Sequence, residues 1–258
     1  MLSTDTRQLK TEAICLKVFP HGESDFIVHF LSPELGKFGV IAKNVRKAKS
    51  QLKGACEVIS VVQLELHRGK NLHILSQYES KQSFPAIRSD IILLAGALVA
   101  VELLAGVTNE GDTDSGYLYD TLLESLQRLE GLSQREEEKL SGLFEQLCLL
   151  SMQVLETSGY GLSVDTCVIC HHTQEMTAPV YYFSPSLGGV LCAECGSTVP
   201  SSSRVKTRAE TLKALAAPSA YSWSPEVGLN TQKLLHYYLS HKLERSLKAY
   251  AFLFDLLI

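Results

Sequence analysis

Residues 11–31, TEAICLKVFPHGESDFIVHFL, contain the pattern that decides the fold class. Thr11–Phe19 and Asp25–Leu31 are short runs rich in β-branched and aromatic residues, and Pro20–Ser24 between them has the composition of a turn. Three similar runs follow, at Lys37–Ala42, Val58–Leu66 and Leu72–Ser83. Five short strands joined by tight turns predict a small closed barrel, for which the OB-fold is the commonest five-stranded example.

The chain changes character after Pro85, where apolar residues recur with a helical period. Ser89–Val107 is apolar nearly all round, which predicts a central buried helix. It is short for a membrane span and contains Glu102. Ser133 and Glu136 have the spacing of a capping box, which predicts a helix over Gln134–Thr157. We also expect helices at Tyr117–Leu129, Thr207–Ala216 and Leu229–Leu257, with a loop at Pro218–Gly228.

Four cysteines carry the strongest chemical signal, because Cys167 and Cys170 form one C-x-x-C pair and Cys192 and Cys195 form another. Two such pairs roughly twenty residues apart have the spacing of a tetrahedral zinc site, since each tight turn aims two thiolates at one ion. Four protein ligands leave no position open for a substrate. The pattern therefore predicts a structural Zn²⁺.

Other uses of these cysteines remain open, although they are less favoured. Iron–sulfur, redox and metal-free cysteines fit the same residues, and His171 or His172 could replace a cysteine ligand. A deaminase-like zinc site would need its C-x-E element before P-C-x-x-C, but here Cys192–Glu194 comes second and Thr166 stands at the proline position.

The cysteine count and the N-terminus indicate a reducing, cytoplasmic setting. Seven cysteines is an odd number, which fits poorly with a fully paired disulfide framework, and the first residues have no signal-peptide pattern. Cys15, Cys56 and Cys148 lie in apolar sequence and are expected to be small buried side chains.

These patterns together predict an α+β protein of more than one domain. We expect an OB-fold domain at residues 1–83 and an α-helical domain at 84–258, with an inserted zinc-ribbon-like segment at 164–200 that holds the four paired cysteines.

The net charge of −4 does not suggest nucleic acid, but the charge is unevenly distributed. One stretch without acids carries five basic residues, Lys43, Arg46, Lys47, Lys49 and Lys53. Cations at this spacing in a barrel loop can follow a phosphate backbone and release its counterions. The alternative is a solvated loop that keeps the protein soluble. Four aromatic residues could stack on bases, although strand aromatics more often pack in a core: Phe19, Phe26, Phe38 and Tyr78.

No catalytic motif is recognisable. The chain has no phosphate-binding glycine loop, no G-x-S-x-G elbow and no H-E-x-x-H pair. Glu136–Glu138 are more simply partners of a helix dipole than metal ligands. We therefore expect no enzyme and no small-molecule substrate. A zinc-stabilised enzyme with an unrecognised site and a protein-binding scaffold remain the alternatives.

Several segments, taken in order, resemble the bacterial recombination mediator family RecO. The similar segments are Thr11–Leu16, Gly22–Val28, Leu35–Lys43 with the basic run to Ser50, the two cysteine pairs, and Tyr238–Lys248. The chain departs from the family pattern at Asn44, where glycine is usual, at Cys56–Val58 and at Ala249.

The resemblance implies a protein that binds single- and double-stranded DNA, anneals complementary strands and helps to load RecA onto strands coated by single-stranded DNA-binding protein. It implies RecR as a partner and leaves RecF open. We expect the DNA surface to be formed by the five cations between Lys43 and Lys53, with Arg204, Lys206 and Arg208 as a second patch. Lys233, Lys242 and Arg245 are candidates for a basic, apolar groove that takes the acidic tail of the single-stranded DNA-binding protein.

Overall fold

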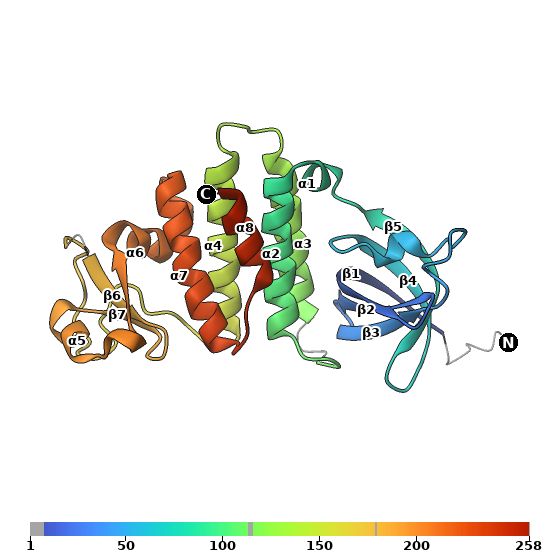
Figure 1. Cartoon of the computed structure of the whole chain (residues 1–258), viewed down its shortest axis with the longest axis horizontal. Coiled ribbons are helices and arrows are strands. Elements are labelled where there is room, and N and C mark those ends of the chain that lie inside the picture. Colours follow the sequence, from blue (N-terminus) through green and yellow to red (C-terminus); the bar gives the residue numbers. More distant parts are fainter. Residues whose placement is uncertain (1–7, 113–115, 179, 258) are drawn as a thin grey trace. The chain divides into compact units, whose positions relative to one another are not determined.

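The computed structural model describes residues 8–112, 116–178 and 180–257 (Figure 1). The chain divides into two compact units. The first contains the described residues up to Asp90 together with Ala100–Glu130, and the second contains Ile91–Val99 and the chain from Gly131 onward.

Five strands close into a barrel in the first unit, drawn in blue to cyan in Figure 1. They are β1 (Gln8–His21), β2 (Asp25–Ser32), β3 (Gly36–Ala42), β4 (Val61–His67) and β5 (His73–Gln82). Antiparallel pairs join β1 to β2 and β4, β2 to β3, and β4 to β5, and a short parallel pairing of β3 with β5 closes the ring. The predicted five-stranded barrel is confirmed.

A β-bulge between Cys15 and Lys17 changes which side chains of β1 face the interior. Ala13 and Cys15 lie in the barrel core before the bulge, and Val18 packs against that core after it. Lys17 and Phe19 are therefore turned outward, and both are exposed. Unbroken alternation from Ala13 and Cys15 would have placed Lys17 and Phe19 inside.

The barrel interior is filled by β-branched and aromatic side chains. Phe38 is only 6% exposed and stacks on the fully buried Phe30, with ring centroids 5.9 Å apart. Phe26 and Tyr78 are partly buried against the same core. Phe38 is therefore a packing residue and not a free base-stacking surface.

Four helices follow the barrel along the chain: α1 (Pro85–Ser89), α2 (Ile91–Val107), α3 (Tyr117–Leu132) and α4 (Lys139–Thr157). The predicted buried helix is confirmed as α2, in which Leu93, Ala97 and Leu103 are fully buried. None of the helices in the described ranges combines the length and apolarity that a membrane crossing requires.

The predicted helix start at Gln134 is wrong. α4 begins at Lys139, and within the described part of the chain Glu138 caps it without a side-chain hydrogen bond. The amide of Glu138 bonds to the carbonyl of Arg135 in a separate turn before the helix. The carboxylate of Glu136 pairs with Lys139 at 2.7 Å instead of reaching back to a helix cap.

The second unit contains a three-stranded antiparallel sheet, in the order β7-β6-β8, beside the cysteine turns. Its strands are β6 (Val180–Ser184), β7 (Gly189–Leu191) and β8 (Val205–Arg208), and the short helix α5 (Ala193–Thr198) follows β7. The helix expected from Thr207 starts at Ala209 as α6 (Ala209–Ala216), because Thr207 pairs with Tyr181 of β6.

The predicted single last helix is instead two helices, α7 (Pro225–Lys242) and α8 (Lys248–Leu257). Glu244 has a φ of 50°, a left-handed conformation that interrupts the helical path. Tyr250 is then buried, with its ring centroid 5.1 Å from that of His236. α7 also starts inside the predicted loop, because Ser224 caps it by accepting the Val227 amide.

Replacing Gly228 with alanine should destabilise the second unit. A Cβ at Gly228 of α7 would lie 2.0 Å from Cδ2 of Phe144 in α4, so the two helices would have to move apart. The overpacking cost of about 1–3 kcal/mol exceeds the helix-propensity gain of about 1 kcal/mol. We therefore expect a net loss of up to about 2 kcal/mol in the free energy of unfolding by urea.

Gly131→Ala in α3 is the matched control, because no neighbouring atom of the described residues lies within 4 Å of the added Cβ. It should leave stability unchanged or raise it by up to about 1 kcal/mol. Equal stability of the two variants would contradict the close approach of α4 and α7.

Candidate metal centre and nucleic-acid interface

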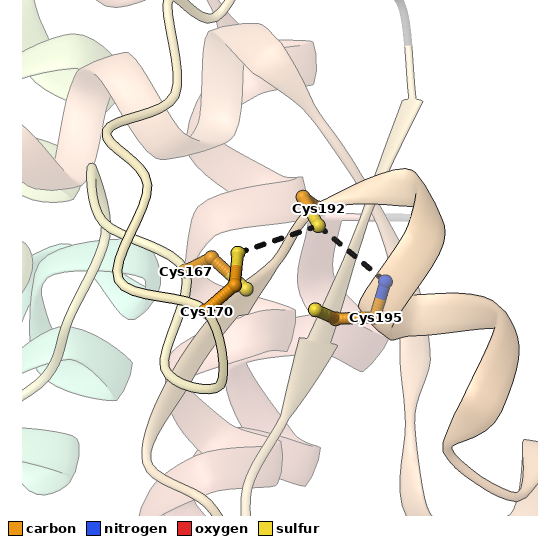
Figure 2. A group of neighbouring side chains, drawn as sticks. All are labelled: Cys167, Cys170, Cys192 and Cys195. Atoms are coloured by element: carbon orange, nitrogen blue, oxygen red, sulfur yellow. Dashed lines mark hydrogen bonds between the residues drawn. The ribbon is translucent and has the colours of Figure 1, made fainter.

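The four cysteines of the two C-x-x-C pairs meet in the second unit, with their sulfur atoms turned toward one another (Figure 2). All four Sγ atoms lie within 4.8 Å of one another, and those of Cys170 and Cys192 are 3.8 Å apart. Four sulfurs at about 2.3 Å from a tetrahedral zinc ion would be separated by about 3.8 Å. The cluster therefore has the dimensions of a metal site with four cysteine ligands.

Backbone hydrogen bonds shape the first cysteine turn. The His171 amide donates to the Cys167 carbonyl at 2.9 Å, and the Cys167 amide donates to the His172 carbonyl at 3.0 Å. His171 takes a φ of 59° and reverses the chain. The amide of Val168 donates to the carbonyl of Val190 at 3.0 Å, which ties this turn to β7. Both histidines are exposed, and the cluster consists of the four cysteines without them.

The second cysteine turn is the start of α5. Cys192 occupies the N-cap position, and its Sγ accepts the amide of Cys195 at 3.4 Å. The Gly196 amide donates to the Cys192 carbonyl at 2.7 Å. Gly196 packs against Tyr182 of β6, where an added Cβ would lie 2.4 Å from the ring. The sheet and the helix thus hold this pair of thiols in place.

The electrostatics of the cluster favour a bound cation. Burial alone would raise the pKa of Cys167, but the backbone N–H groups of Cys170, Cys192 and Ile169 outweigh it and lower that pKa to about 6. The neighbouring Cys192 side chain, and then burial, raise the pKa of Cys195 to about 12. One thiolate therefore forms readily, while a positive ion is needed to hold all four as ligands.

The other three cysteines are packing residues, as predicted. Cys15 and Cys148 are fully buried and Cys56 is 9% exposed. Burial raises the pKa of Cys15 well above its usual range, and it raises the pKa of Cys56 and of Cys148 to about 12.

The five cations between Lys43 and Lys53 lie on the connection between β3 and β4, and all five are exposed. We call this segment, residues 43–56, the basic connection. Val45, Ala55 and Cys56 are buried and anchor it in the barrel core. Across the described ranges, none of the five cations forms an ion pair. Their charge is therefore available to a ligand.

Hydrogen bonds hold the basic connection against the turn between β1 and β2. The Arg46 amide donates to the Ser24 carbonyl at 2.9 Å, and its guanidinium donates to the Gly22 carbonyl at 3.3 Å. The amide of Asn44 donates to the Asp25 carboxylate at 2.7 Å. Asn44 has a φ of 54°, which explains in physical terms why glycine suits this position.

The second basic patch is not a surface of three unpaired cations. The Arg204 guanidinium lies 4.0 Å from the centroid of the Tyr182 ring, and one of its nitrogens is buried without a hydrogen-bond partner among the described residues. Arg208 forms an ion pair with Glu226 of α7. Lys206, on the same strand face as Arg208, is exposed.

Two residues of this patch, Lys206 and Arg208, line a groove of about 400 Å³ in the second unit. It is lined by Lys206, Arg208 and Lys233 together with the apolar side chains of Leu234 and Tyr237. We call it the β8–α7 groove. Sequence reasoning did not link Lys233 with β8, because the two segments are brought together only by packing.

Lys242 and Arg245 do not share the β8–α7 groove with Lys233. Lys242 follows about two and a half helical turns after Lys233 and so lies on the opposite side of α7. Its ammonium is 5.3 Å from the centroid of the Tyr238 ring. Arg245 lies beyond the end of α7 and is exposed.

The chain matches two family models in succession. The model described as Recombination protein O N terminal matches residues 6–84, and Recombination protein O C terminal matches residues 88–251. The two matches together cover most of the chain.

The chain is also similar to curated proteins named DNA repair protein RecO. The protein of Dehalococcoides mccartyi is 34% identical over 197 residues, which cover 76% of this chain and 73% of the relative. That of Pelotomaculum thermopropionicum is 31% identical over 255 residues, covering 95% and 93%. That of Roseiflexus sp. is 30% identical over 257 residues, covering 96% and 86%. The chain therefore belongs to the RecO family of DNA repair and recombination proteins.

Proposed function

We propose that this protein binds DNA through its barrel, anneals complementary strands, and helps to load RecA onto strands coated by single-stranded DNA-binding protein. The observation that carries the proposal is the basic connection, whose five exposed cations form no ion pair in the described residues. Membership of the RecO family supports a role in DNA repair and recombination. No catalytic step is assigned to any residue.

Strand annealing requires two polyanions to be held close together. Cations that bind phosphates release condensed counterions and screen the repulsion between the strands. The cations of the basic connection can do so without first breaking an ion pair. The hydrogen bonds from Arg46 and Asn44 already order the segment, which reduces the entropy lost when DNA binds.

We further propose RecR and the acidic tail of single-stranded DNA-binding protein as partners. The β8–α7 groove supports tail binding, because it sets Lys206 and Lys233 beside the apolar Leu234 and Tyr237. Lys242 and Arg245 are not among the residues that line this groove, so they would not contact a tail bound in it.

We propose two domains, a DNA-binding domain at 1–83 and a helical domain at 84–258. The zinc-ribbon-like segment at 164–200 is proposed to have a structural role within the helical domain. Cys167, Cys170, Cys192 and Cys195 would hold Zn²⁺, which would supply a fixed cross-link between the two cysteine turns. The work of the protein is proposed to take place on nucleoid DNA in the cytoplasm.

The annealing of two complementary, dye-labelled oligonucleotides tests the proposal. At low salt the protein should accelerate annealing at least tenfold over the spontaneous rate. Five phosphate contacts on single strands predict that DNA affinity falls about 100-fold between 50 and 200 mM salt. Annealing should fade over the same range. No acceleration, together with no salt-dependent binding, would favour a protein-binding scaffold instead.

A further inference from the structure

The outer face of β1 beyond the bulge carries an exposed aromatic ring between two basic side chains. Phe19 is 37% exposed, and Lys17 and His21 are exposed on either side of it. Strand alternation places the three on one face of the sheet. Ile27 of β2 pairs with Phe19, and Ile41 of β3 pairs with Ile27, so half-buried apolar side chains continue the row.

The basic connection borders this face. His21 ends β1, and the turn that follows holds Arg46 through the carbonyls of Gly22 and Ser24. The stripe of Lys17, Phe19 and His21 therefore leads directly to the cations of the basic connection. A ligand that crosses the outer face can reach both sets of side chains.

Next to Phe19 on this face, His29 of β2 lies opposite Lys17. Nδ1 of His29 lies 3.5 Å from a carboxylate oxygen of Glu110. Burial lowers the pKa of His29, and the nearby Glu110 offsets this only in part, so the ring is mainly neutral at pH 7. The positive charges of Lys37 and Lys17 add to this lowering, so cations lie near this part of the face as well.

We infer that Phe19 stacks on a base of single-stranded DNA bound across this face, while Lys17, His21 and the basic connection contact its phosphates. The inference rests on the proposed DNA-binding function. A single strand has free base faces, and an aromatic ring stacks on any of them without regard to sequence. In a duplex those faces are already occupied by neighbouring bases.

Lys17 competes with a base for the Phe19 ring. Its Nζ lies 4.7 Å from the ring centroid. An exposed cation–π contact changes an equilibrium constant by about two- to fivefold, whereas stacking of one base changes the binding constant by about five- to 150-fold. The flexible lysine chain can move its ammonium to a phosphate. A base therefore displaces Lys17, and Lys17 gains a phosphate contact.

Binding of two fluorescent strands to Phe19→Ala tests the inference. One strand has mixed sequence, and the other has the same length and phosphates but no bases. Phe19→Ala should weaken binding of the normal strand about 5- to 50-fold and change binding of the abasic strand less than about twofold. The salt dependence should keep its slope, because no phosphate contact is lost. Phe19→Trp should restore binding.

Phe252→Ala is the matched control, since Phe252 is also 37% exposed but lies on α8. It should change neither affinity. Equal losses on both strands, or no loss on either, for Phe19→Ala would overturn the stacking role while leaving DNA binding itself intact. A wild-type protein that binds neither strand would contradict the proposed function together with this inference.

Discussion

If the four cysteines hold zinc as proposed, replacing Cys170 with serine should release the ion and loosen the segment around the cysteine turns and β6–β8, while the barrel stays folded. Cys170 is exposed, so the change removes a proposed metal ligand but almost no buried surface. Structural zinc contributes about 10–16 kcal/mol of apparent binding free energy in zinc-finger peptides. A serine hydroxyl does not replace a thiolate ligand.

Apart from the proposed metal, the segment is held by short strands and by packing against α7, where the buried Phe183 ring lies 5.7 Å from that of Tyr238. β6, β7 and β8 have five, three and four residues, and short strands of this kind are not stable alone. The small hydrophobic cluster beside them is formed by Tyr181, Val190, Ala209 and Leu212. Without the metal, we expect the sheet to open locally before the rest of the second unit.

The zinc content per chain and the hydrogen exchange of backbone amides test this prediction. After dialysis against a weak chelator, the wild type should keep about one zinc per chain and Cys170→Ser well under half of one. The amides of Val168 and Val190, which join the first cysteine segment to β7, and the amide of Gly196, which bonds to the Cys192 carbonyl within the second turn, should lose protection. Amides of β1–β5 should not.

His172→Ala is the control for the zinc experiment, because His172 is an exposed neighbour outside the cluster. It should keep both the metal and the protection. A Cys170→Ser protein with full zinc and unchanged exchange would show that the four cysteines do not form a structural site.

Reversing four charges of the basic connection should remove most DNA binding and annealing. The variant changes Lys43, Arg46, Lys47 and Lys49 to glutamate. Each phosphate contact on a single strand contributes about 0.7 to the salt slope, so four contacts contribute about 2.8. At physiological salt this corresponds to a loss of about 100-fold or more in affinity. Repulsion between the new carboxylates and the phosphates adds to the loss.

The fold should survive this change. All four side chains are exposed, and the buried anchors Val45 and Ala55 remain. Arg46 keeps its amide hydrogen bond to Ser24, since that bond is made by the backbone. Thermal unfolding should therefore shift little, and the measured effect should lie in binding.

The matched control reverses four exposed cations on other elements, Lys81, Arg128, Arg135 and Lys248. Three of them form exposed ion pairs, worth about 1 kcal/mol or less each. The two variants have the same net charge, so a shared loss would reflect overall charge and not a DNA surface. Full annealing by the first variant would move the DNA site away from the basic connection.

Local spacing explains what could be predicted from the chain alone. The five strands are short β-branched and aromatic runs bounded by turn residues, and these patterns depend only on neighbouring positions. The C-x-x-C pairs are local for the same reason, because a turn of four residues sets the direction of both thiols. The start of α4 and the break near Glu244 were missed, since neither of the connecting segments, residues 133–138 and 243–247, contains a glycine or a proline.

The sequence by itself determined the number of barrel strands, the four thiols of the candidate metal cluster and the stretch that holds the five cations, but not the small sheet of β6, β7 and β8. Tertiary structure alone decided which cations are available, because Arg208 meets Glu226 and Lys233 meets β8 only through packing of distant segments. It also decided, through one bulge in β1, that Phe19 faces outward. The physical reason is that backbone geometry relates residues a few positions apart, whereas pairing across the fold depends on how whole elements pack.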